Sequence, residues 1–222
     1  MTKPGSLRPV DAASVVLIDR SQDRYRVLVG KRSSKHVFMP DLYVFPGGRR
    51  DRHDWRTPVS APLHPAAIER LRVHTSARTG QATLHGLGVA ALRELHEEAG
   101  LTIGTRVSGE PAALPFLPDL SMLRFFARAI TPPGQPRRFD TRFFALFTDE
   151  TGIDPTSASD SHELQDLRWV DIFEQLNVDM PMITIQVLEE LKRCLQQDPS
   201  LPFGAQVAFF RNHRGQVVRD ML

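Results

Sequence analysis

One segment of the chain combines a strong helical pattern with a concentration of negative charge. Across Leu87–Ala99 the apolar residues recur at helical spacing, and Gly100 follows as a typical C-terminal stop. Glu94, Glu97 and Glu98 are three and four positions apart, so their side chains leave one face within a single turn. Because like charges repel, this face favours a bound cation, and carboxylates suit hard ions such as Mg²⁺, Mn²⁺ or Ca²⁺. A solvated acidic patch is the competing interpretation.

The segments around this helix are rich in β-branched and aromatic residues, which is typical of strands. Strands are predicted at 14–18, 26–32, 42–45, 122–130, 142–148 and 164–171, helices at 66–78 and 181–197, and a hairpin within 207–219. Gly80 and Gly86 are expected to interrupt the helical pattern between 78 and 87. Since helices interrupt the strands, we expect an α/β (α+β) fold with a mixed β-sheet, built as a single domain over residues 1–222.

Composition excludes several classes of protein. With 41% hydrophobic and 24% charged residues the chain is typical of soluble globular proteins, and no apolar run approaches the roughly 18 residues that cross a bilayer. The lone Cys194 cannot form an internal disulfide, which suits a cytoplasmic location. Residues 1–80 carry a net charge of +8 and residues 81–222 one of −6. The basic residues lack interleaved aromatics, so we expect an anionic small molecule as partner, and neither nucleic acid nor a membrane.

A second informative segment precedes the helix in the sequence. The predicted strand 42–45 runs directly into Pro46-Gly47-Gly48. Glycines at such a turn allow a ligand to approach the backbone closely. Together, the glycine turn and the acidic helix indicate a ligand site more strongly than either feature does alone.

The stretch Arg93–Leu101, preceded by Gly48, resembles the signature box of the Nudix hydrolase family, G-x5-E-x7-R-E-U-x-E-E-x-G-U, in which U is aliphatic. Asp54 stands where the box has its first glutamate. Between Gly48 and Arg93 lie 44 residues where the box has 13, so the chain carries an insertion of 31. The resemblance implies an α/β/α sandwich with an insertion at about 49–86 and a C-terminal extension at about 198–222. We expect the insertion to fold over the pocket and to turn its arginines toward an anionic substrate.

An inserted box of this kind is similar to the subgroup that includes the peroxisomal coenzyme A diphosphatase. Arg32-Ser33 and Phe45-Pro46-Gly47-Gly48 match the spacing of a coenzyme A signature found in related enzymes, whereas Val37, Asp41 and Val29-Gly30 depart from it. The segment Arg137–Thr141 also resembles this subgroup. Coenzyme A or an acyl derivative is therefore the substrate that the resemblance favours.

The resemblance also implies roles for individual residues. Divalent Mg²⁺ or Mn²⁺ would be held by Glu94, Glu97, Glu98 and the main-chain carbonyl of Gly48, and Arg93 would orient Glu97. The catalytic set would comprise Arg93, Glu97, Glu98 and Glu163, with Glu163 and Glu97 as alternative general bases. Substrate contacts are predicted for Arg32, Gly47, Arg137, Arg138 and Asp140, although Asp140 and Thr141 are also suited to shaping their loop.

Three functions remain open at this point. The first is a metal-dependent diphosphatase that acts on coenzyme A or an acyl-CoA. The second is the same chemistry on another nucleoside diphosphate derivative, such as a nucleotide sugar or a dinucleotide. The third is a ligand-binding regulator without catalysis. A homodimer is the assembly we consider for any of the three.

Overall fold

The computed structural model describes residues 7–34, 39–76, 79–107 and 114–222. The helices are η1 (Ser21–Asp23), η2 (Asp54–Arg56), α1 (Pro65–Arg72), α2 (Gln81–Ala99), α3 (Thr148–Thr151), η3 (Pro155–Ser157) and α4 (Met182–Gln197). The strands are β1 (Val10–Asp19), β2 (Arg26–Arg32), β3 (Tyr43–Val44), β4 (Gly47–Arg49), β5 (Gly104–Arg106), β6 (Phe116–Pro118), β7 (Arg124–Ile130), β8 (Phe139–Phe147), β9 (Leu164–Asp171), β10 (Ala208–His213) and β11 (Gln216–Met221).

A single large sheet organises these elements. Nine of the described strands form it in the order β11-β10-β7-β8-β1-β2-β3, with β4 paired to β1 and β9 paired to β2. Strand β1 runs parallel to β8 and β10 runs parallel to β7, whereas β7 and β8 are antiparallel. The predicted mixed sheet is therefore confirmed, and strands from both ends of the chain contribute to it.

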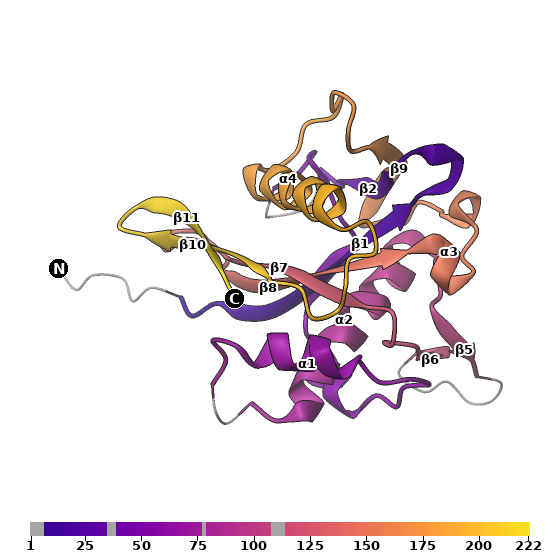
Figure 1. The fold of residues 1–222 in the computed structure, drawn as a ribbon, viewed down its shortest axis with the longest axis horizontal. Helices are drawn as coiled ribbons and strands as arrows, with labels where there is room; N and C mark the ends of the chain where they lie inside the picture. Colours follow the sequence, from indigo (N-terminus) through magenta and orange to yellow (C-terminus); the bar gives the residue numbers. More distant parts are fainter. Residues whose placement is uncertain (1–6, 35–38, 77–78, 108–113) are drawn as a thin grey trace.

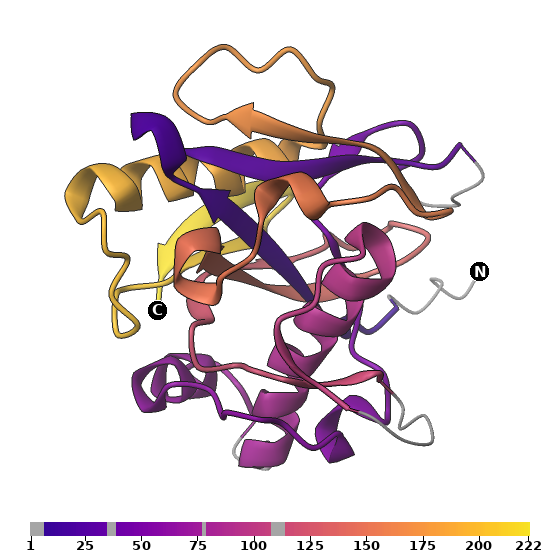
Figure 2. The ribbon, with the colours of Figure 1, turned by 90° about the vertical axis from the view of Figure 1, so that its right-hand side faces the viewer.

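Helices cover the sheet on both faces (Figure 1). On one face, α2 packs with Leu87, Leu92 and Leu95 into a cluster that includes Val15 of β1. On the other face, Leu188 of α4 belongs to a second cluster with alternating strand residues. Figure 2 shows the sheet between these layers from the side. The α/β/α layering expected from the sequence is observed. None of the described helices combines the length and the apolar character needed to cross a bilayer.

Helix α2 is longer than its sequence pattern predicts. It begins at Gln81 and passes through Gly86, so the prediction that Gly86 interrupts the helix is wrong. A Cβ at Gly86 would lie 3.0 Å from the backbone nitrogen of Trp55, which leaves no room for a side chain. The glycine thus serves a close contact between α2 and η2.

The insertion at about 49–86 lies against α2, on the side of the molecule that carries α1 (Figure 1). Its Leu63 and Leu71 are buried in the α2 cluster. Arg70 donates hydrogen bonds to the carbonyl oxygen of Gly204, at 2.7 and 2.9 Å. Burying these leucines draws the insertion away from the α4 face of the sheet.

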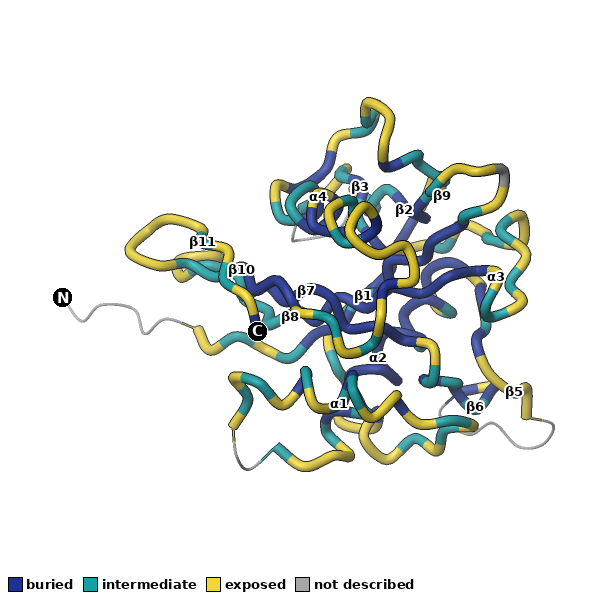
Figure 3. The backbone as a smooth tube through the Cα atoms, viewed as in Figure 1, coloured by how far each residue is buried: buried dark blue, intermediate teal, exposed yellow. Residues whose placement is uncertain are grey.

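The C-terminal segment forms the hairpin that the sequence predicts. Strand β10 pairs with β11 and also with β7, so the hairpin extends the central sheet at one edge. Figure 3 shows that its tip is exposed, whereas the half that adjoins β7 is buried. Buried Phe209 and Phe210 point to opposite faces and join the two apolar clusters. The hairpin is therefore part of the core and not a loose tail.

Candidate active site

Strand β4 brings the glycine turn against β1 and α2. Gly47 pairs with Ser14, and Gly48 pairs with Ala13. A Cβ on Gly47 would lie 2.1 Å from the Ser14 hydroxyl oxygen, and one on Gly48 would lie 2.4 Å from Oε1 of Glu94. A side chain at Gly47 would clash with β1, and one at Gly48 would displace the Glu94 carboxylate, so the two glycines allow β4 to lie close to both elements.

Glu98 is the most enclosed of the three box glutamates. The backbone N–H of Gly47 donates a hydrogen bond of 2.8 Å to its Oε2. Burial raises the pKa of Glu98 to about 8, and the charge of Glu94 adds to the rise, while the bond from Gly47 opposes it. Burial also raises the pKa of Glu94, against the attraction of Arg93. Two carboxylates are thus held where the protein only partly compensates their charge.

Arg93 is the centre of an ion-pair network on the same helix. Its Nη1 donates to Glu94 at 2.7 Å and to Glu97 at 2.9 Å. Its Nε donates to Asp54 at 3.1 Å, and Nη2 donates to the carbonyl oxygen of Arg49 at 3.1 Å. Although burial disfavours its charge, the hydrogen bond to Asp54 and the charge of Glu94 raise the pKa of Arg93. Arg93 therefore stays cationic and positions the helix against the loop after β4.

Asp54 comes from the insertion yet lies buried beside Arg93. It is separated from Arg93 by 39 positions in the sequence. The short helix η2 that carries it packs on α2 through the Gly86 contact. An ion pair thus joins the two halves of the box despite the inserted residues.

A cavity of about 850 Å³ opens beside these groups. Glu94 and Glu98 lie in its wall together with Gly47, Gly48 and Arg32. Its volume is in the range of small-molecule sites. Of the described insertion residues after Gly48, Arg49 alone lines the cavity, so the prediction that the insertion folds over the pocket is wrong for its described part.

Glu163 also lines the cavity, next to Arg32. The two are brought together by the pairing of β2 with β9, in which the Ser33 N–H donates to the Glu163 carbonyl at 3.1 Å. The negative charge of Glu163 contributes to the raised pKa of Glu94 and of Glu98. Three carboxylates and one guanidinium therefore share this end of the cavity.

Glu97 differs from its two neighbours on the helix. Its side chain is 51% exposed and pairs with Arg93, and it is not among the residues that line the cavity. The structure therefore brings Glu94, Glu98, Glu163 and Gly48 together and leaves Glu97 at the edge of this group.

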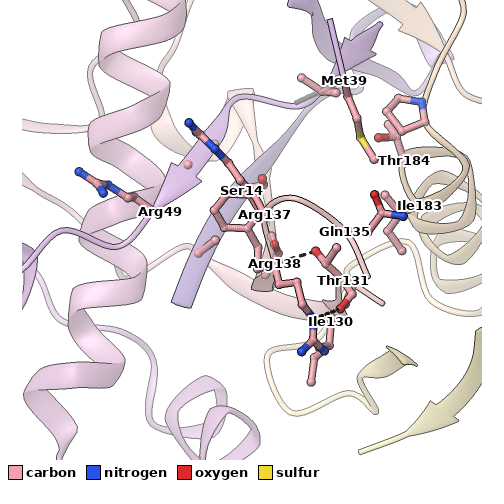
Figure 4. A pocket seen from close by; sticks show the side chains of 18 of the residues that line it. Ser14, Met39, Arg49, Ile130, Thr131, Gln135, Arg137, Arg138, Ile183 and Thr184 are labelled. Atoms are coloured by element: carbon pink, nitrogen blue, oxygen red, sulfur yellow. Dashed lines mark hydrogen bonds between the residues drawn. The ribbon is translucent and has the colours of Figure 1, made fainter. Parts of the chain in front are cut away.

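The remaining predicted substrate contacts are divided between the cavity and the sheet. Arg137 and Arg138 line the cavity (Figure 4). Arg138 donates to the carbonyl oxygens of Thr131 and Leu7, at 2.9 and 2.6 Å. Asp140 does not line the cavity, because its carboxylate pairs with Arg128 at 2.7 Å and with Arg142 at 3.2 Å. Val37, one of the departures from the coenzyme A signature, lies outside the described residues.

No three histidine, cysteine, aspartate or glutamate side chains converge as a preformed metal cluster within the described ranges. Arg93 binds oxygens of Glu94 and Glu97, while Glu98 accepts from Gly47, so their oxygens are directed to protein donors. The donor chemistry nevertheless fits a hard divalent cation, because carboxylates with raised pKa values face one cavity.

Some lining residues have no counterpart among the sequence-based candidates. Ser14 and Thr184 contribute hydroxyls, and Met182, Phe210 and Val217 contribute apolar surface. They come from β1, from α4 and from the terminal hairpin. The alternation in 207–219 predicted the hairpin, but no motif in the sequence marks these five positions as neighbours of the acidic helix.

The fold and the arrangement of this site are similar to those of Nudix hydrolases. Two comparisons support a Nudix hydrolase enzyme. A crystal structure of a Nudix hydrolase from Alicyclobacillus acidocaldarius is 26% identical and superposes with a TM-score of 0.60, covering 84% of this chain and 92% of that one. The chain is also 26% identical over 183 residues to a Caenorhabditis elegans protein provisionally named nudix hydrolase 7.

The curated relative is considerably longer than the matched region. The match covers 72% of this chain and 50% of the Caenorhabditis elegans protein, so the chain spans about half the length of that relative. The Nudix domain of Shewanella oneidensis NrtR, complexed with ADP-ribose, has a TM-score of 0.51 at 14% identity, covering 85% of this chain and 90% of that one, and shows the shared fold alone. No family model matches the sequence.

Proposed function

We propose that the chain is a divalent-metal-dependent diphosphatase that hydrolyses coenzyme A or an acyl-CoA. The observation that carries the proposal is the meeting of two enclosed carboxylates, Glu94 and Glu98, with the Gly47-Gly48 strand at one end of a cavity of about 850 Å³. In the reaction, the oxygen of water bonds to one phosphorus, the P–O–P bridge breaks on that side, and the departing phosphate takes the bridging oxygen.

Glu94 and Glu98 would hold Mg²⁺ or Mn²⁺ in this proposal, with the carbonyl of Gly48 and with Glu97 as further candidate ligands. When bound, such an ion neutralises the diphosphate and lowers the pKa of a coordinated water. The raised pKa values of Glu94 and Glu98 support this assignment, since a cation would relieve the repulsion between them.

The protein's own groups divide into positioning and proton-handling residues. Arg93 acts by holding Glu94 and Glu97 and by anchoring Asp54. Glu163 and Glu98 line the cavity, so they are better placed than the exposed Glu97 to accept a proton from water. Arg32 lies at the same end and is suited to grip a phosphate.

Coenzyme A is favoured over smaller diphosphates because the cavity continues well beyond the carboxylates and becomes apolar. Gly47 would let the substrate approach the backbone closely, and Arg137 would present a cation to it from the cavity wall. Arg138 and Asp140 would fix the shape of the neighbouring loop. A second candidate is another nucleoside diphosphate derivative, and ADP-ribose in the Shewanella oneidensis domain supports it at the level of the fold. A cytoplasmic location, a single domain and a homodimer are further parts of the proposal.

The decisive experiment is phosphorus NMR of coenzyme A incubated with the protein and Mg²⁺ or Mn²⁺. We expect 3′-phosphoadenosine 5′-phosphate and 4′-phosphopantetheine, with ¹⁸O from labelled water in one of the two. A panel with ADP-ribose, a nucleotide sugar and a dinucleotide runs in parallel. Turnover of the panel without turnover of coenzyme A would favour the second candidate, and ligand binding without any turnover would favour a regulator.

A further inference from the structure

The cavity floor follows one row of paired residues across the sheet. Arg49 of β4 pairs with Ala12, Ala12 with Thr141, Thr141 with Ala129, and Ala129 with Phe210 of β10. All five line the cavity. Four inter-strand spacings of roughly 4.8 Å separate β4 from β10, so the floor is about 19 Å long. This length exceeds what a diphosphate alone requires.

The two ends of this floor differ in chemistry. At the β4 end lie Glu94, Glu98, Glu163 and Arg32. The part of the cavity toward the terminal hairpin and the N-terminus of α4 is walled by aliphatic side chains. In Figure 4, Arg49 lies beside α2, whereas Ile183 and Thr184 lie at the distant wall. With the cation of the proposed function bound beside Arg32, a ligand that fills the cavity would place a phosphate at the carboxylate end and an apolar group at the other.

The aliphatic wall is exposed to an unusual degree. Four large apolar residues that line it are exposed: Leu7 (55%), Val10 (48%), Met182 (68%) and Val217 (49%). They come from the N-terminal segment, from α4 and from β11, so three separate parts of the chain place apolar side chains around one opening. Exposed apolar side chains gathered around one opening are typical of a binding site.

Two arginines of the cavity wall are engaged with the protein. Arg138 donates to the carbonyl oxygens of Thr131 and Leu7, and Arg211 of β10 pairs with Asp220 at 2.7 Å. Arg8 and Arg137 line the cavity as well. The exposed aliphatic side chains offer apolar surface, which suits an alkyl chain better than a nucleobase or a sugar, because the polar groups of those ligands need polar partners.

We propose that the outer part of this cavity binds an aliphatic chain attached to the diphosphate substrate, with Met182 and Val217 as specificity-determining residues. The assignment of the phosphate to the carboxylate end rests on the proposed function. The assignment of the aliphatic chain to the other end rests on the residues that line the same cavity there. Burial of each methylene group of the chain would strengthen binding roughly fourfold.

The test uses butyl phosphate and decyl phosphate as probes, titrated calorimetrically in the presence of Mg²⁺ and below the concentration at which micelles form. Neither probe contains an anhydride, so binding is measured without turnover. We expect decyl phosphate to bind at least tenfold more tightly than butyl phosphate. In Met182→Gln and Val217→Gln we expect this ratio to fall three- to tenfold, with the affinity for butyl phosphate unchanged.

Matched controls are available on surfaces away from the cavity. Met122 and Val107 are also exposed and do not line it, so Met122→Gln and Val107→Gln should keep the wild-type ratio. Equal affinity for both probes, or an equal loss in the control variants, would overturn the inference. The inference would also be overturned if light scattering showed a dimer for the wild type and a monomer for Met182→Gln. That result would assign the exposed apolar residues to contact with a second copy of the chain. Failure to cleave coenzyme A would overturn the proposed substrate while leaving the probe ratio as an independent result.

Discussion

The two ends of the cavity are built on different physical principles. At the carboxylate end, Gly47 donates to Glu98, and Arg93 donates to Glu94 and Glu97, over 2.7 to 2.9 Å. Glycines let the backbone approach the helix closely there. At the apolar end, Met182 and Val217 lie exposed on separate elements. The comparison shows that one end demands fixed geometry for chemistry, whereas the other offers adaptable surface for binding.

Replacing Glu98 with Gln should have the largest effect on catalysis. The substitution keeps the shape of the side chain and removes its charge, so we expect a loss of about 10²–10⁴-fold in kcat with the metal present. Glu189→Gln, on the exposed side of α4, is the matched control and should retain wild-type activity. Full activity of Glu98→Gln in the diphosphatase assay would refute the role of the carboxylate end.

Asp54→Asn should have an intermediate effect, because Asp54 acts on the site through Arg93. We expect a decrease of roughly 10–100-fold in activity or in metal affinity. Loss of the buried charge partner should also lower the free energy of unfolding by about 1–3 kcal/mol. The measurements are Mn²⁺ titrations of activity and chemical denaturation. Asp54→Glu keeps the charge and should recover part of the activity; if it does not, Asp54 has some role other than pairing with Arg93.

The metal-free protein should become less stable as the pH rises from about 5 to 8. The folded state raises the pKa of Glu98 to about 8, so between its ordinary value and 8 the folded protein binds more protons than the unfolded chain. The stabilisation is complete below the ordinary pKa of glutamate and is lost as the pH passes through the folded value. We expect Tm to fall by about 3–6 °C, which corresponds to roughly 1–2 kcal/mol for a chain of this size.

The same measurement of Tm against pH on Glu98→Gln is the control for this pH dependence. Its Tm should change less over that interval, since the titrating group is gone. Added Mn²⁺ should raise the Tm of the wild-type protein most strongly at the alkaline end, where the carboxylate is ionised. An unchanged slope in the variant would show that other groups control the pH dependence.

Met182→Gln should have the smallest effect and should act only on substrate preference. For decanoyl-CoA we expect KM to rise three- to tenfold, and more than the KM for coenzyme A, while kcat remains as in the wild type, because the substitution weakens uniform binding and not the chemical step. Steady-state kinetics with the two substrates make the test. A decrease in kcat would show that the two ends are not independent.

Local patterns were sufficient to predict much of the fold. The strand at 164–171 and the helix at 181–197 agree with β9 and α4 within a residue, because period-two and period-3.6 patterns are local properties of the chain. Gly86 is the instructive failure, since the reason for the glycine is a contact with Trp55, 31 positions away. Such contacts override local preference and leave no periodic signal.

Local sequence is enough to define the carboxylate end: a helical turn places Glu94 beside Glu98, and Gly100 ends the helix, all within seven residues. The folded chain alone shows that Asp54 reaches Arg93 across the insertion, that the insertion packs away from the cavity, and that the N-terminal segment, α4 and β11 meet at its apolar end. The two kinds of feature differ in their range along the sequence. Backbone geometry sets the spacing of side chains within a turn, whereas the neighbours of a distant segment depend on which apolar surfaces the whole chain buries together.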